Sequence, residues 1–193
     1  MVHGAGRVPD LEDLDLKSAG VQYSRAGIAV NEYLQSVSNP MVYAAGDCAD
    51  SGGPPLSPVA AYEGRVVAAN LLESNQTKTE YEPVPSIVFT IPPLARVGLD
   101  EEEARRRQLR FSVRHEDTSG WHSSRRAGEH QSAFKLLIDE RTDRILGAHL
   151  LGLQADETIN LFALAMRADV PANQLKQVLW AYPTRASDIQ YMV

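Results

Sequence analysis

The pattern of hydrophobic and polar positions divides the chain into two parts. Before residue 74, short apolar runs precede one long stretch with helical spacing, whereas after residue 81 short strand-like runs follow one another closely. Between them, 74–80 is polar and has no periodicity, which makes it the predicted domain boundary. The first part is expected to contain a turn over 11–19, two brief strands within 20–30, a buried strand over 41–45 and a helix from residue 57.

The helix that starts at residue 57 is predicted from its capping residues. Ser57 offers a hydroxyl at the cap position, Pro58 occupies the first helical position, and Val59 begins an apolar stripe that includes Val66. The first N–H groups of a helix have no partner within the helix and carry partial positive charge. An open helix start is therefore expected close to the acidic end of the preceding strand.

The second part predicts an antiparallel meander with helices. Asp100 and Glu103 form a capping box for a helix to about residue 108. Further helices are expected over 154–168 and 171–180. The predicted strands are 86–91, 95–98, 111–115, 121–125, 134–138 and 145–151. This is an α+β arrangement, a four- to five-stranded antiparallel sheet flanked by helices.

Asp47 gives the first indication of a ligand. It is predicted to end a buried strand, beside the open start of the helix at Ser57. A carboxylate accepts hydrogen bonds from hydroxyl groups, and a helix start stabilises negative charge. A flavin dinucleotide meets both conditions, with its ribityl chain at Asp47 and its reduced isoalloxazine near Ser57, Pro58 and Val59.

The residues around Asp47 also resemble a known family. The order small-x-x-Pro-x-aliphatic-Tyr-Ala-x-Gly-Asp over 37–47, followed by Ser-Pro-Val-Ala, is similar to the second flavin-binding segment of the pyridine nucleotide-disulfide oxidoreductases. This family includes glutathione reductase, dihydrolipoamide dehydrogenase and mercuric reductase. The resemblance implies FAD as cofactor and NADPH or NADH as donor. The implied FAD contacts are Gly46, Asp47, Leu56, Ser57, Pro58 and Val59.

Further segments extend the resemblance over nearly the whole chain. Residues 90–104 are similar to the family's Pro-x-x-x-Val-Gly-Leu-Thr-Glu-x-Glu-Ala segment, and 144–152 to its central interface strand. Residues 2–10 resemble the Ala-x-Gly-Arg-x-Pro segment that the family has between domains. The resemblance implies that 1–74 is the C-terminal segment of an FAD-binding domain, a partial α/β segment, and that 81–193 is a dimerisation domain that forms a homodimer.

No dinucleotide-binding Gly-x-Gly-x-x-Gly fold is found in the sequence, since Gly4-Ala-Gly6 is followed by Arg-Val-Pro. We therefore expect the chain to be the C-terminal part of a longer FAD-dependent reductase, inactive by itself. The alternative hypothesis is a stand-alone dimerisation or interaction module derived from such an enzyme.

Tyr182 is the candidate catalytic residue. Disulfide reductases of this family end the interface domain with His-Pro-Thr-x-Ser-Glu, and here Tyr182 replaces the His and Ser187 the Glu, with Asp188 one residue later. A phenol, with a pKa of about 10, accepts protons poorly at neutral pH but donates hydrogen bonds. Tyr182 is therefore either a contact to a small-molecule electron acceptor or a packing residue at the dimer interface.

Composition excludes several other classes of function. With one cysteine, Cys48, the chain has no disulfide and no Cys pair, which supports neither disulfide nor mercury reduction by this chain, and Cys48 is expected to be a small buried hydrophobe. The net charge of −6 argues against nucleic acid or an anionic membrane as partner. No apolar segment reaches transmembrane length and no signal peptide is evident, so a cytoplasmic location is expected.

The histidines and tryptophans are expected to have structural roles. His115, His122 and His130 are predicted to be exposed polar residues rather than metal ligands. His149, which alternates with apolar neighbours, is predicted to be a hydrogen-bonded core or interface residue. Trp121 and Trp180 are expected to be packing anchors.

Overall fold

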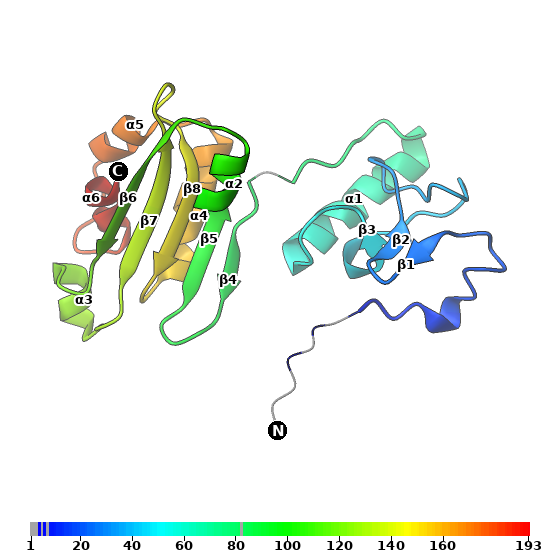
Figure 1. Cartoon of the computed structure of the whole chain (residues 1–193), viewed down its shortest axis with the longest axis horizontal. Helices are drawn as coiled ribbons and strands as arrows, with labels where there is room; N and C mark the ends of the chain where they lie inside the picture. Colours follow the sequence, from blue (N-terminus) through cyan, green and yellow to red (C-terminus); the bar gives the residue numbers. More distant parts are fainter. Residues whose placement is uncertain (1–3, 5, 7, 82) are drawn as a thin grey trace. The chain divides into compact units, whose positions relative to one another are not determined.

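The computed structural model describes residues 4, 6, 8–81 and 83–193, which form two compact units, Met1–Tyr81 and Glu82–Val193 (Figure 1). Each unit has its own hydrophobic core. The segment 2–10, which resembles the family's segment between domains, includes Val2, His3, Ala5 and Arg7, and these four residues lie outside the described part.

The first unit is built from a small sheet and one long helix. Strand β1 (Tyr23–Ser24) pairs antiparallel with β2 (Gly27–Ala29), which pairs in parallel with β3 (Ala49–Asp50). The 3-10 turns η1 (Glu12–Leu14) and η2 (Gly46–Cys48) precede helix α1 (Ser57–Glu73). The apolar core of the first unit consists of Leu11, Leu16, Val21, Ile28 and Ala44. The two brief strands predicted within 20–30 are confirmed.

The predicted buried strand over 41–45 is wrong. Met41 is 86% exposed, and Tyr43 makes only an isolated bridge to Gln35. The reason is a turn, in which the backbone N–H of Val42 bonds to the carbonyl of Asn39. Asp47 consequently lies in η2 and precedes β3 instead of ending a strand.

Helix α1 begins at Ser57, but its cap lies one residue earlier than predicted. Leu56 is the N-cap residue, with extended backbone, Ser57 is already helical, and no side chain caps the helix. The prediction that the Ser57 hydroxyl is the cap is therefore wrong, although Pro58 lies in the first turn as expected.

The polar stretch after α1 packs against the first unit. The buried Asn70 side chain donates to the carbonyls of Tyr33 and Thr77 and accepts from the N–H of Thr77. Lys78 forms an ion pair with Glu32. Further along, the N–H of Glu80 bonds to the hydroxyl of Tyr62, so the chain stays against α1 as far as residue 80.

The second unit is a five-stranded antiparallel sheet in the order β4-β5-β8-β7-β6 (Figure 1). The strands are β4 (Ser86–Val88), β5 (Leu94–Gly98), β6 (Phe111–Asp117), β7 (Ala133–Asp139) and β8 (Ile145–Leu151). The helices are α2 (Glu101–Arg106), α3 (His122–Ala127), α4 (Ala155–Arg167), α5 (Ala172–Gln177) and α6 (Ile189–Met192), with the turn η3 (Ala186–Asp188) before α6. The predicted α+β class with an antiparallel sheet and flanking helices is confirmed.

One face of the sheet forms the main core. Helix α4 lies behind the sheet in Figure 1, and its fully buried Ile159 and Phe162 belong to the same cluster as Leu136 of β7 and Ala148 of β8. Alternate residues of the strands point to the opposite face of the sheet. In the register of the sheet, His149 of β8 is paired with Arg96 of β5 and Lys135 of β7.

The segment 121–125 is a helix, α3, and the predicted strand there is wrong. The backbone N–H of Trp121 bonds to the carbonyl of Thr118, and the N–H of Arg125 then bonds to the carbonyl of Trp121. Ser123 and Ser124 are buried because they contact Arg185, far along the chain. The predicted helix at 100–108 is confirmed as α2.

Candidate functional site

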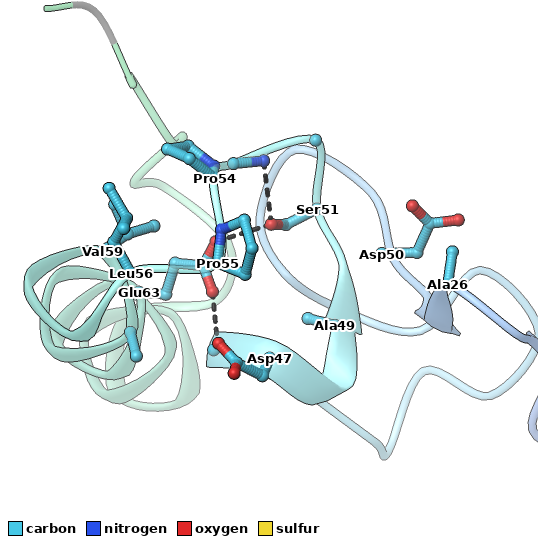
Figure 2. Close-up of a pocket in the computed structure, with 14 residues that line it drawn as sticks. Ala26, Asp47, Ala49, Asp50, Ser51, Pro54, Pro55, Leu56, Val59 and Glu63 are labelled. Carbon is cyan, nitrogen blue, oxygen red and sulfur yellow. Dashed lines mark hydrogen bonds between the residues drawn. The ribbon is translucent and has the colours of Figure 1, made fainter. Parts of the chain in front are cut away.

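The first candidate site is a pocket of about 210 Å³ between the 46–56 loop and the start of α1 (Figure 2). We call it the loop pocket. Four of the six residues predicted to contact FAD line it: Gly46, Asp47, Leu56 and Val59. The other two, Ser57 and Pro58, are exposed in the first turn of α1 and are not among its lining residues.

Gly46 allows the loop to approach α1 closely. Its φ is +72°, in the left-handed region that favours glycine. A Cβ atom at this position would lie 3.0 Å from the Cβ of Ala60. The Gly-Asp dipeptide therefore places the backbone of Asp47 directly against the first turns of the helix.

Glu63 is the central polar residue of the loop pocket and was not among the residues predicted from the sequence. Glu63 is only 1% exposed, and its carboxylate accepts from the N–H of Gly46 at 2.5 Å and the hydroxyl of Ser51 at 2.6 Å (Figure 2). It also accepts from the hydroxyl of Tyr81 at 2.7 Å. Burial raises the pKa of the Tyr81 phenol, which keeps it a hydrogen-bond donor. One signal was available in the sequence, since Glu63 lies between Val59 and Val66 on the apolar stripe of α1.

The start of α1 adds positive electrostatic potential to the loop pocket. The N–H of Ala60 bonds to the carbonyl of Leu56, so the N–H groups before it have no partner within the helix. Their partial charges favour an anionic or electron-rich group. The loop pocket thus combines the Asp47 carboxylate, as a hydrogen-bond acceptor, with a helix start that favours negative charge.

The second candidate site is a pocket of about 450 Å³ in the second unit, which we call the aromatic pocket. Its lining residues are Glu116, Trp121, His122, Ser123, Tyr182, Pro183, Thr184, Ser187, Asp188 and Tyr191. Tyr182 is 70% exposed, and its ring stacks on that of His122 with centroids 6.0 Å apart and planes inclined by 24°. The phenolic oxygen of Tyr182 lies 3.5 Å from Nδ1 of His122.

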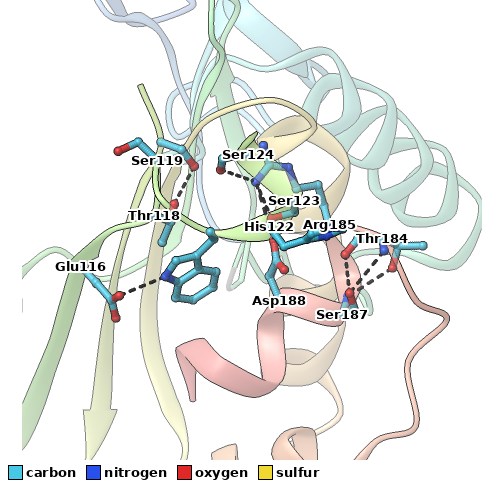
Figure 3. Close-up of polar contacts among 12 residues, drawn as sticks. Glu116, Thr118, Ser119, His122, Ser123, Ser124, Thr184, Arg185, Ser187 and Asp188 are labelled. Atoms are coloured by element: carbon cyan, nitrogen blue, oxygen red, sulfur yellow. Dashed lines mark hydrogen bonds and ion pairs between the residues drawn. The ribbon is translucent and has the colours of Figure 1, made fainter. Parts of the chain in front are cut away.

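Asp188 and Ser187 do not orient Tyr182. The Asp188 carboxylate accepts from the hydroxyl of Ser123 at 2.5 Å and lies 3.6 Å from the guanidinium of Arg185 (Figure 3). Ser187 donates to the backbone carbonyl of Thr184 at 2.6 Å. Burial is the main influence on Asp188 and raises its pKa above the usual value. Among the described residues, Tyr182 therefore has no carboxylate partner of the kind that the resemblance implies for a catalytic histidine.

The histidines predicted to have structural roles are either exposed or partly buried. His115, His122 and His130 are exposed. His149 is partly buried, with Nε2 3.1 Å from the carbonyl of Leu99, and burial lowers its pKa. The prediction that His149 is hydrogen-bonded is confirmed.

The side chains of Cys48 and Trp121 contact other parts of the protein. The thiol of Cys48 is partly buried and donates to the carbonyl of Ala45 at 3.2 Å. The ring of Trp121 packs against those of Phe134 and Tyr191. Over the described part of the chain, no three His, Cys, Asp or Glu side chains gather in a way that would hold a metal ion, and no helix there has the length and apolar character needed to cross a membrane.

The family of the chain follows from comparison with known proteins. The fold is that of the flavoprotein disulfide reductases: the solved Cu(II) complex of the HOCl-induced flavoprotein disulfide reductase RclA from Escherichia coli has a TM-score of 0.88 and 27% identity. That likeness covers 98% of this chain and 44% of RclA. Residues 84–193 match the model of the pyridine nucleotide-disulphide oxidoreductase dimerisation domain, and residues 1–64 match the pyridine nucleotide-disulphide oxidoreductase model. The chain belongs to the pyridine nucleotide-disulphide oxidoreductase family, as the sequence resemblance implied.

Two relatives from Staphylococcus aureus differ greatly in length. An uncharacterised 19.7 kDa protein in a mercuric resistance operon is 49% identical over 180 residues, which cover 93% of this chain and all of that protein. A mercuric reductase is 35% identical over 96% of this chain but only 34% of its own length. The chain thus spans about a third of the reductase and the whole of the shorter relative.

Proposed function

We propose that the chain is the C-terminal part of an FAD-dependent NAD(P)H oxidoreductase. The observation that supports this most is the loop pocket, where the buried Glu63 carboxylate fixes Gly46 and therefore Asp47 beside the start of α1. Members of the family are FAD-dependent oxidoreductases. The donor, NADPH or NADH, would bind to a domain that this chain does not include.

The residues of the loop pocket suit one edge of a flavin dinucleotide. Asp47 would accept hydrogen bonds from the ribityl hydroxyls, and the N–H groups at the start of α1 would stabilise negative charge on the isoalloxazine. Bound FAD would accept two electrons and pass them on. Glu63 would act only on the protein, by keeping the N–H of Gly46 paired and the loop in place.

Tyr182 would contact the substrate, a small-molecule electron acceptor, from the second unit. Its exposed hydroxyl can donate a hydrogen bond to a group that becomes more negative on reduction. The dimerisation domain of this family implies a homodimer, here through residues 81–193. Apolar side chains that are fully exposed in the second unit, Ile91 and Leu179, are consistent with a covering partner.

The experiment that tests this function is a visible absorption spectrum of the product of the complete gene, recorded anaerobically before and after NADPH and then NADH. A flavin band that one of the two donors bleaches is expected. The variant Asp47→Asn should bind FAD more weakly, about 10-fold for the loss of one charge-assisted hydrogen bond, whereas Asp13→Asn in the exposed turn η1 should not. A product that stays colourless with added FAD would contradict the proposal and leave the chain as a dimerisation module.

A further inference from the structure

We propose that His122 is a positioning residue for Tyr182, and that the imidazole and the phenol together relay a proton between solvent and a substrate in the aromatic pocket. The inference rests on the proposed function and deepens it, because it assigns a donor for the proton that Tyr182 regains. His122 is exposed at the start of α3 and belongs to neither hydrophobic cluster of the described residues.

The contact between the two rings has the geometry of a relay. Nδ1 of His122 is 3.5 Å from the Tyr182 oxygen, and the rings are stacked at 24°. Hydrogen bonds between catalytic groups are often long without substrate and shorten in the complex. Both side chains are exposed and both line the aromatic pocket, so the pair contacts solvent and pocket at once.

A phenol that has given its proton to a substrate must regain one before the next turnover. Imidazole is the side chain that ordinarily exchanges protons between about pH 5 and about pH 8, so a histidine beside a phenol is a suitable proton donor to it. Two other polar residues of the pocket already have partners. Asp188 accepts from the hydroxyl of Ser123, and Ser187 donates to the backbone carbonyl of Thr184. His122 is therefore the neighbour of Tyr182 that suits the task.

The steps of the relay balance. When the substrate has become an anion on reduction, the Tyr182 O–H bond breaks and its proton forms a bond to that anion; bound FAD would supply the two electrons. The proton on Nδ1 of the His122 imidazolium passes to the phenolate oxygen, which restores the phenol. The neutral imidazole then regains a proton from solvent, so one proton has moved from solvent to product.

The charged groups near His122 have both signs. The carboxylates of Asp188 and Glu116 line the same pocket, and Asp188 and His122 attract each other. Arg185 is bonded to Ser123 and Ser124, and it forms an ion pair with Asp188. The remaining cations of α3, Arg125 and Arg126, are exposed to water.

The first test measures the coupling in this chain, without flavin or substrate. In an NMR spectrum of the ring nitrogens, removal of the hydroxyl in Tyr182→Phe should change the chemical shift of Nδ1 of His122, because that nitrogen loses its hydrogen-bond partner while the stacked ring is kept. The matched control is Tyr191→Phe, which removes a hydroxyl from the same pocket and should leave the Nδ1 shift in place. The same Nδ1 shift in the wild type and in Tyr182→Phe would overturn the inference.

The second test uses the flavin-loaded product of the complete gene. The variant His122→Asn keeps a hydrogen-bonding atom near the place of Nδ1 but does not titrate, so the fall of kcat/KM with rising pH should disappear and its value should drop by about 10- to 100-fold. His130→Asn, at an exposed position, is the control. A wild-type pH profile in His122→Asn would overturn the relay. A colourless protein would contradict the proposed function instead. The NMR test would then decide by itself whether His122 and Tyr182 are hydrogen-bonded.

Discussion

The carboxylate of Glu63, in the second turn of α1, accepts a hydrogen bond of 2.5 Å from the backbone N–H of Gly46. This bond joins the helix to the Gly-Asp turn that carries Asp47. Because Glu63 also accepts from Ser51 and Tyr81, one buried side chain ties the loop, the helix and the end of the first unit together.

Replacing Glu63 should destabilise the first unit strongly. In Glu63→Ala three donors lose their acceptor, and the expected loss in the free energy of unfolding is about 3 kcal/mol. Glu63→Gln, which keeps one acceptor oxygen, should lose less. Urea unfolding of this chain measures both, with Glu73→Ala at an exposed site on the same helix as control. A loss no larger than that of the control would show that the three bonds contribute nothing.

Gly46→Ala should also be destabilising. A left-handed backbone costs a residue with a Cβ atom about 1–2 kcal/mol, and the new methyl group would press against Ala60. The matched control is Gly64→Ala on α1, where a Cβ atom meets nothing within 4 Å, so the change should be neutral or stabilising. In thermal unfolding, the Tm of Gly46→Ala should fall, whereas the Tm of Gly64→Ala should stay the same or rise. Equal changes in Tm would contradict the prediction.

Asp100 should stabilise helix α2 through its side chain. It accepts from the N–H of Glu103 at 2.8 Å, as the capping box predicts. Asp100→Ala should lower the free energy of unfolding by about 1 kcal/mol, and Asp100→Asn by much less, since asparagine is also a good cap. Glu102→Ala, exposed on the same helix, serves as the comparison. If Asp100→Asn lost as much as Asp100→Ala, capping would not be the cause.

His149 should make the second unit less stable in acid. Burial, helped by the charges of Arg96 and Lys135, holds its pKa below 6.5. The folded state therefore binds fewer protons than the unfolded state, so the stabilisation is present above pH 6.5 and is lost as pH falls below it. His149→Gln keeps a donor for Leu99 and should reduce the drop in unfolding free energy between about pH 8 and about pH 5. His130→Gln should leave that drop unchanged, and an unchanged drop in both variants would refute the assignment.

Dimer formation should depend on the fully exposed apolar side chains of the second unit. If residues 81–193 form the homodimer, Ile91→Glu and Leu179→Glu should weaken self-association, by about 10-fold or more for a buried charge without a partner. Leu72→Glu, at a site 86% exposed in the first unit, is the control. Sedimentation equilibrium gives the dissociation constants. A monomeric wild type, or three variants with equal constants, would rule out this surface.

Much of the second unit is predictable because its interactions are local or periodic. The alternation in β7 and β8 and the cap at Asp100 are expressed within a few residues of sequence. Helix α3 was missed because its buried residue Ser123 is paired with Asp188, 65 positions away. No local pattern reports such a contact.

The loop pocket was predictable only in part. Gly46, Asp47, Leu56 and Val59 were found from their order in the chain, and the structure brings them together. Glu63 was not found, because an acidic residue on a helix is usually exposed and only the fold supplies its three donors. The contact between His122 and Tyr182, likewise, depends on a helix that the sequence did not predict.

The order of the strands in the second unit has a consequence for aggregation. β4 and β6 end the sheet, and each has, within the described residues, a strand partner on one side only. Open edges of this kind invite pairing with strands of other molecules. β4 has only three residues, and the longer β6 carries four successive ionisable side chains, from Arg114 to Asp117. Both edges are thus protected against the edge-to-edge pairing that leads to fibre-like growth.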